Sequence, residues 1–241
     1  IRVLDGVIQD VRFGAEAGSL HQNPGERVID LDGDYLAPGL ISCHTHLSIV
    51  FPFREMDENE HPGLTALRAA KRAREALLAG ITTIRTAGEL HRIDLVVREA
   101  VRRGWLQGPD IVAAGRGVDV SGGHGAGFGV VIADGADAFL RAAREELAAG
   151  ADHVKVFLSG GIAGRAEGFG ETKVSLAEAE AAVHAARSHQ TYVTAHAGDV
   201  EPIKLGLRAG VRCYEHGYRL DLDTAHGFEE WTIKKALAAA P

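Results

Sequence analysis

The stretch that decides the fold is Pro38-Gly-Leu-Ile-Ser-Cys-His-Thr-His-Leu47. Its apolar first half predicts a buried β-strand over Gly39–His46, opened by proline and glycine. Residues i and i+2 of a strand point to one face, so His44 and His46 are predicted to converge at the strand's carboxyl end. Neutral imidazole is a good zinc ligand, so the pair is a candidate half of a metal site. The alternative is a coincidental pair of surface histidines.

Downstream of this strand, strand-like and helix-like segments alternate. Helices are predicted to end on Gly80, Gly150 and Gly210, each of which can take the left-handed conformation before the next strand. Alternation of this kind predicts a parallel sheet, and strands this apolar predict burial on both faces, as in a (β/α)8 TIM-type barrel. An open doubly wound sheet is the competitor, although no G-x-G-x-x-G follows the first strand. The further strands are predicted at Ile81–Arg85, Asp110–Ala114, Val154–Leu158, Tyr192–His196 and Val211–Glu215, and the helices at Leu64–Ala79, near Ile93–Arg103, at Ala136–Ala149 and after the capping box of Ser175 and Glu178.

The two ends of the chain differ from this pattern. Residues 1–36 contain short β-like runs, among them Arg27–Leu31, and are predicted to form part of a small β-domain. The barrel domain is predicted over residues 37–241. Only residues 219–241 follow the sixth strand, too few for two more strand–helix units. We therefore expect a barrel that lacks strands seven and eight in this sequence, or that receives them from another chain.

Three more residues occupy strand ends equivalent to that of His46, namely Lys155, His196 and His216. A lysine inside an apolar strand is costly to bury as an ammonium ion, unless it reaches solvent or pairs with a carboxylate. A desolvated neutral amine can instead take up carbon dioxide, and the resulting carbamate can bridge two cations. Together the five side chains supply two ligands, a bridge and two more ligands, which fits a binuclear metal site.

These residues resemble the motif set of the amidohydrolase superfamily. Its His-x-His, its strand-four lysine and its two later histidines match His44, His46, Lys155, His196 and His216. The resemblance implies a small β-sandwich before the barrel, two divalent metal ions, with Zn²⁺ the first choice, and carbamylation of Lys155. It also implies a general-base aspartate at the end of strand eight, and no matching aspartate is found in this chain.

Within the superfamily, the chain resembles the imidazolonepropionase-like and prolidase-like branch. The loop Ser121-Gly-Gly-His-Gly125 and the tyrosine in Glu215-His-Gly-Tyr218 match motifs of that branch. The resemblance implies that His124 and Tyr218 hold the carboxylate and the scissile carbonyl of the substrate. The alternatives are a flexible loop histidine and a tyrosine that packs at the barrel rim.

The predicted activity is metal-dependent hydrolysis, in which hydroxide shared by two metal ions cleaves the amide of a dipeptide-like substrate (Xaa-Pro or N-acyl amino acid). A cyclic amidase or deaminase of the same superfamily is the enzymatic alternative. A catalytically dead, metal-binding homologue with a scaffold role is the alternative from another class.

Composition narrows the class of protein. The 241 residues carry 26 Lys+Arg and 33 Asp+Glu, so the net charge is 26 − 33 = −7, which disfavours nucleic acid as a partner. Two cysteines are too few for a disulfide scaffold, and no apolar run is long enough for a membrane span. We expect a cytoplasmic homo-oligomer, with an N-terminal leader left open because the sequence begins at Ile1. The basic run Arg68–Arg74 predicts an exposed helix face.

Overall fold

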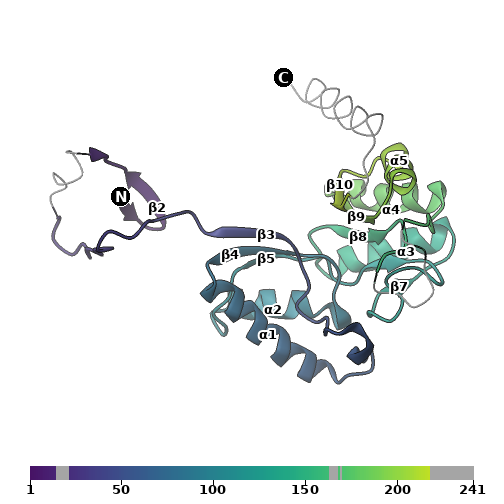
Figure 1. The fold of residues 1–241 in the computed structure, drawn as a ribbon, viewed down its shortest axis with the longest axis horizontal. Coiled ribbons are helices and arrows are strands. Elements are labelled where there is room, and N and C mark those ends of the chain that lie inside the picture. Colours follow the sequence, from purple (N-terminus) through teal and green to yellow (C-terminus); the bar gives the residue numbers. More distant parts are fainter. Residues whose placement is uncertain (15–21, 163–167, 169, 218–241) are drawn as a thin grey trace. The chain divides into compact units, whose positions relative to one another are not determined.

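The computed structural model describes residues 1–14, 22–162, 168 and 170–217 (Figure 1). The chain divides into two compact units, Ile1–Pro38 and Gly39–Pro241, and each is described by itself. None of the helices in these described ranges is long and apolar enough to cross a membrane.

The first unit contains an antiparallel hairpin of β1 (Arg2–Leu4) and β2 (Val7–Asp10). Its turn residues Asp5 and Gly6 have φ values of 50° and 76°, the positive pair that a type I′ hairpin turn requires. The prediction of a strand over Arg27–Leu31 is wrong, because that segment has no ladder partner and its apolar side chains are exposed. The strands in the described part of this unit form one two-stranded sheet, and the β-sandwich of which it is expected to be part stays a prediction.

The second unit begins with a parallel sheet of β3 (Leu40–Thr45), β4 (Ile81–Thr86) and β5 (Asp110–Val112). Helices α1 (Pro62–Leu78) and α2 (Ile93–Arg102) cover one face of this sheet (Figure 1). Short 3-10 turns lie at Phe53–Glu55 and Leu90–Arg92. The core between sheet and helices consists of small and branched apolar residues, namely Leu47, Ala69, Ala73, Ile84, Ile93, Val97, Ile111 and Ala113.

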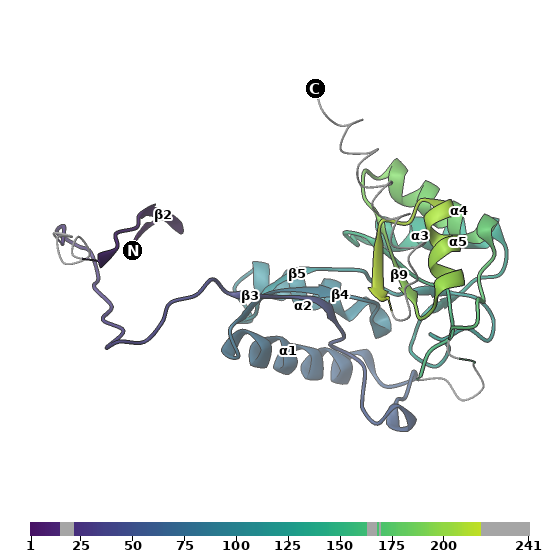
Figure 2. The same cartoon turned by 45° about the horizontal axis from the view of Figure 1, so that its top comes forward.

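A second parallel sheet follows, with the strand order β10-β9-β8-β6-β7. Its helices α3 (Ala136–Ala148), α4 (Leu176–Ser188) and α5 (Val200–Ala209) lie together beside β9 (Figure 2). The capping box of Ser175 and Glu178 opens α4 as predicted. The strands are β6 (Val118–Asp119), β7 (Val131–Ile132), β8 (Val154–Phe157), β9 (Val193–Ala197) and β10 (Cys213–His216).

The predicted alternation of strands and helices is confirmed, and Gly80, Gly150 and Gly210 have the expected positive φ values of 87°, 106° and 88°. The described strands form two parallel sheets rather than one closed barrel, because no ladder joins β5 to β6 among them. Individual polar contacts join the sheets at this junction instead.

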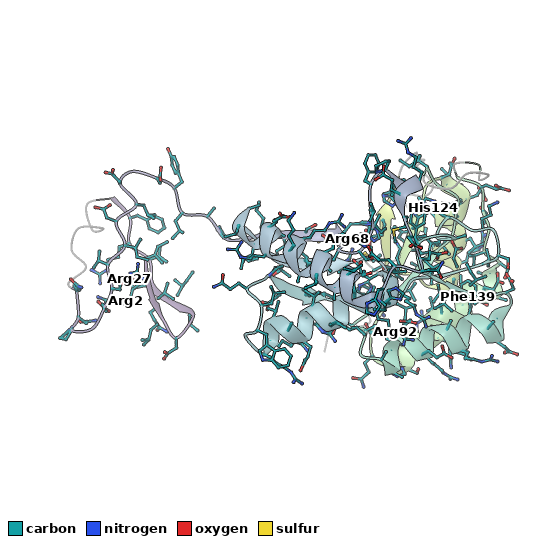
Figure 3. All side chains as sticks on the ribbon, turned by 90° about the horizontal axis from the view of Figure 1, so that it is seen from below. Arg2, Arg27, Arg68, Arg92, His124 and Phe139 are labelled. Carbon is teal, nitrogen blue, oxygen red and sulfur yellow. The ribbon has the colours of Figure 1, made fainter. Side chains whose placement is uncertain are left out.

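Two kinds of contact make up the junction between the sheets. The backbone N–H of Asp152 donates to the carbonyl of Ala113 at 2.7 Å. The carboxylate of Glu146 in α3 is fully buried and pairs with Arg92, labelled in Figure 3, at 2.7 Å. Glu146 also pairs with Arg116 at 2.8 Å.

The prediction that Arg68–Arg74 forms an exposed helix face is partly wrong. Arg68 (Figure 3) is half-buried, pairs with Glu60 at 2.6 Å and donates to the carbonyl of Ser48 at 3.1 Å. Arg72 donates to the carbonyl of Leu47 at 2.9 Å. Both guanidinium groups therefore satisfy backbone carbonyls of the loop that follows β3.

Candidate active site

A cavity of about 320 Å³ lies at the carboxyl ends of strands from both sheets. All five predicted metal ligands line it, together with His124. Most of the remaining wall is apolar and consists of Ile49, Phe53, Phe128, Val130, Phe157 and Ile162. The sequence pattern therefore predicts which residues share a site, and the structure adds that this site has an apolar wall.

His44 and His46 meet as the period of two predicts, with their Nε2 atoms 3.1 Å apart. The Nδ1 atom of His46 lies 2.9 Å from the carbonyl oxygen of Gly88. A carbonyl only accepts hydrogen bonds, so His46 donates from Nδ1 and, when neutral, keeps its lone pair on Nε2. The Nδ1 atom of His44 lies 2.6 Å from Oε2 of Glu215. An ionised carboxylate also only accepts hydrogen bonds, so His44 likewise donates from Nδ1. Both Nε2 atoms then present lone pairs to one place.

That geometry provides a test of whether a metal ion fits. Two nitrogens bound 2.0–2.1 Å from a tetrahedral zinc ion are about 3.3 Å from each other. The observed 3.1 Å between the Nε2 atoms of His44 and His46 is close to this value. Facing lone pairs repel unless a proton or a cation lies near both, so this pair of nitrogens suits a divalent metal ion.

His196 and His216 approach the pair from β9 and β10. The His216 ring centroid lies 4.9 Å from that of His44 and 4.7 Å from that of His196. The Nε2 atom of His196 lies 3.1 Å from the carbonyl oxygen of Gly160, so its Nδ1 is the nitrogen with a free lone pair in the neutral ring. His216 has a left-handed φ of 73°, which breaks the strand alternation and lets both Glu215 and His216 approach His44.

The electrostatics keep the imidazoles of His46, His196 and His216 neutral. Burial, followed by the charges of His44 and Lys155, lowers the pKa of His46 to about 3. Burial and the neighbouring His124 lower the pKa of His196 to about 2, and burial with Lys155 lowers the pKa of His216 to about 4. Neutral imidazole is the form that binds metal ions, so no proton has to be displaced from these rings near pH 7.

Lys155 is 1% exposed and faces the cavity. Its Nζ lies 5.0 Å from the centroid of the Phe157 ring and makes no hydrogen bond or ion pair to any residue that the structure describes. Burial lowers its pKa to about 8, against the opposing effect of Glu215. The amine is therefore partly neutral near physiological pH, which is the form that reacts with carbon dioxide.

Glu215 and Arg85 belong to the site although no sequence motif indicates them. Glu215 is 5% exposed and accepts from His44 through Oε2 and from Arg85 through Oε1, the latter at 2.7 Å. Burial acts to raise the pKa of Glu215, but the His44 hydrogen bond and the charges of Lys155 and Arg85 bring it down to about 2. No local signal in the sequence indicates either residue, because Arg85 and Glu215 are 130 residues apart and meet only when the sheets come together.

His124 lies on the predicted glycine loop. Its ring stacks on that of His196, with the centroids 4.2 Å apart and the planes inclined by 18°. The loop is held by the buried carboxylate of Asp119, which accepts from the backbone N–H of Val120 at 2.8 Å and of Gly125 at 2.7 Å. Asp119 is a further residue that the sequence analysis missed. The predicted Tyr218 lies outside the described residues.

The predicted ligands line one cavity, but they do not form a complete metal coordination shell. Within the part of the chain that the structure describes, no group of three or more His, Cys, Asp or Glu side chains stands in an arrangement that could hold a metal ion. The histidines meet through ring packing. The chemistry of the donors fits a divalent cation, because it consists of neutral nitrogens and one uncommitted amine.

Comparison with known proteins decides the family. The sequence profile described as "Amidohydrolase family" matches residues 35–235, which is most of the chain. The chain belongs to the amidohydrolase family. The predicted resemblance to this family is thereby confirmed, and the α/β architecture described above is the amidohydrolase one.

The chain is similar to three relatives of known name or structure. A prolidase solved in complex with N-methylphosphonate-L-proline superposes with a TM-score of 0.81 and 30% identity, covering 88% of this chain and 55% of that one. Ochratoxinase from Aspergillus niger is 27% identical over 208 residues, covering 75% of this chain and 43% of that protein. Imidazolonepropionase from Mesorhizobium japonicum is 32% identical over 109 residues, covering 42% of this chain and 26% of that protein. The amidohydrolase chain thus spans about half the length of such relatives, or less.

Proposed function

We propose that this protein is a metal-dependent amidohydrolase that cleaves the amide bond of a dipeptide-like substrate, either Xaa-Pro or an N-acyl amino acid. The observation that carries the proposal is the convergence of four histidines and a buried lysine on one largely apolar cavity. The similarity to a prolidase and to ochratoxinase supports amide hydrolysis as the class of reaction.

The residues that would hold two divalent cations, with Zn²⁺ the first choice, are His44, His46, Lys155, His196 and His216. When bound, such cations polarise a scissile carbonyl and lower the pKa of a water molecule. Lys155 would bridge them as a carbamate. In that reaction the neutral amine forms an N–C bond to carbon dioxide and releases one proton, so the product carries one negative charge.

The other residues of the cavity bind and orient the substrate. In the proposed complex an imidazole N–H of His124 donates to the substrate carboxylate, and the stacking of the ring on His196 fixes the ring plane. The apolar wall around Phe53 and Phe128 keeps water from the reacting amide and strengthens each polar contact inside. Tyr218 is proposed as the donor to the scissile carbonyl.

The test is a substrate panel on the intact protein, assayed as purified, after treatment with a chelator, and after zinc is restored. Xaa-Pro dipeptides, N-acyl amino acids and cyclic imides make up the panel. We expect hydrolysis of the first two classes that is lost with the chelator and returns with zinc. His46→Ala should abolish it, while His184→Ala, on the exposed face of α4, is the matched control and should leave it unchanged.

The alternatives give different results. Turnover of cyclic imides alone would replace the proposal with a cyclic amidase. Stoichiometric zinc binding by a folded protein that hydrolyses nothing in the panel would favour the dead homologue. Unchanged hydrolysis after complete removal of metal would refute metal dependence.

A further inference from the structure

Glu215 is shared between an imidazole and a guanidinium group. Its Oε2 accepts from Nδ1 of His44 at 2.6 Å, and its Oε1 accepts from Nη2 of Arg85 at 2.7 Å. The carboxylate is 5% exposed, so neither donor is readily replaced by water. A buried carboxylate with one acceptor oxygen for each of two donors is a specific arrangement, because an amide offers one acceptor only.

Arg85 is itself fixed from three sides. Its Nε donates to the carbonyl of Cys43 at 2.8 Å, and its Nη1 to Sγ of Cys213 at 3.2 Å. Arg85 belongs to β4, Cys43 to β3, and Cys213 with Glu215 to β10. The guanidinium group therefore holds Glu215 in register with the strand that carries His44.

The consequence for His44 concerns its tautomer. Because Nδ1 donates to Glu215, a neutral His44 must carry its lone pair on Nε2, the atom that faces His46 at 3.1 Å. The other tautomer would donate from Nε2 to His46, but it would leave an unprotonated Nδ1 2.6 Å from Oε2 of an ionised carboxylate, and its metal-binding nitrogen would carry the proton. His46 and His196 are fixed by the carbonyls of Gly88 and Gly160, which cannot change their role, whereas His44 depends on a side chain.

We propose that Glu215, held in place by Arg85, is a positioning residue that fixes His44 as the tautomer protonated on Nδ1 and thereby sets the metal affinity of the site. The inference rests on the proposed metal-dependent function, but its central claim concerns the metal-free protein. Partners of this kind typically change metal affinity by about 10–100-fold.

The direct test is the tautomer of His44 in the metal-free, intact protein, read by long-range ¹H–¹⁵N correlation of the imidazole. We expect the Nδ1-protonated form in the wild type and a mixture of tautomers in Glu215→Gln. In this variant the single amide oxygen cannot serve both His44 and Arg85. A wild-type His44 protonated on Nε2 would overturn the proposal without the need for any variant.

The second readout is zinc affinity, measured by competition with a chromogenic chelator. We expect Glu215→Gln to bind zinc about 10–100-fold more weakly than the wild type. Equal zinc affinity of Glu215→Gln and the wild type would refute the proposed role.

Glu178→Gln is the control, because Glu178 is also buried and accepts from Ser175 and from the backbone N–H of Gly135, but it contacts no imidazole and does not join the two sheets. It should lower the melting temperature and leave the zinc affinity unchanged, and a comparable loss of affinity would reduce Glu215 to an ordinary structural ion pair. A folded wild type that binds no zinc would refute the proposed function. It would leave the tautomer to be decided by the imidazole spectra alone.

Discussion

The ring of His124 lies against the Cα of Gly161, with no room for a side chain between them. A β-carbon at position 161 would stand 2.4 Å from Cε1 of His124, much closer than atoms in contact can be. The glycine after β8 and the histidine of the loop after β6 are therefore a matched pair from two connections of the same sheet. His124 owes its stacking on His196 to this close approach.

Gly161→Ala should displace the His124 ring and raise KM for the dipeptide-like substrate by about tenfold, a loss typical of a charge-assisted hydrogen bond. His124→Ala should raise KM similarly. The double variant should be no worse than His124→Ala, because the methyl group then meets no ring. Steady-state kinetics on the three variants test this. Additive losses would show that Gly161 acts independently of His124.

Lys155→Met removes an amine that is buried and faces the cavity. Because the methionine is of similar length and carries no charge to desolvate, the free energy of unfolding should rise by about 1–2 kcal/mol in the metal-free protein. Hydrolysis should be lost. Denaturant unfolding and the substrate assay give the two readings, and Lys71→Met on the exposed face of α1 is the control expected to change neither. Retained activity in Lys155→Met would contradict a bridging role.

Phe128→Ala should weaken binding of substrates with large apolar side chains. Phe128 lines the cavity and packs edge-to-face on Phe53, with the centroids 5.3 Å apart. Removing the ring should cost an aromatic substrate roughly 1–2 kcal/mol of binding energy and so raise its KM. The KM of a small substrate should rise less. Phe139→Leu, on the buried face of α3, should lower the melting temperature without this selectivity. Equal KM changes for large and small substrates would argue against a side-chain pocket.

Glu60 links stability to acid pH. The hydrogen bonds from Arg68 and Thr65 lower the pKa of Glu60 from 4.5 to about 2. A lowered carboxyl pKa gives stability that is present above pH 4.5 and is lost as the pH falls towards 2. Because Glu60 is partly exposed, we expect the free energy of unfolding of the wild type to fall by only about 1 kcal/mol more than that of Glu60→Gln over this pH range. Chemical denaturation at several pH values measures the difference, and a parallel decline in both proteins would contradict it. Glu99→Gln removes a more exposed ion pair and should show a smaller effect.

What could be predicted from the sequence follows from local periodicity. The period of two places His44 beside His46, and the glycines at helix ends place Lys155 and His216 at equivalent ends of strands. Arg85 and Glu215 could not be predicted, because their partner atoms belong to strands about 130 residues apart in sequence and depend on how the sheets meet. The burial of Arg68 could not be predicted either. Its charge favours solvent, whereas its partner Glu60 lies in the loop before α1. Long-range polar contacts have no sequence period.

The junction between the two sheets has a consequence for the cavity. His44 and His46 belong to the three-stranded sheet, while Lys155, His196 and His216 belong to the five-stranded one. Any ligand that binds both groups at once acts as a cross-link between the sheets, and the energy of binding adds to the free energy that keeps them docked. Conversely, a fluctuation that separates the sheets moves the two histidines of the three-stranded sheet away from the three side chains of the five-stranded sheet. Opening the junction would therefore release a bound ligand without unfolding either sheet.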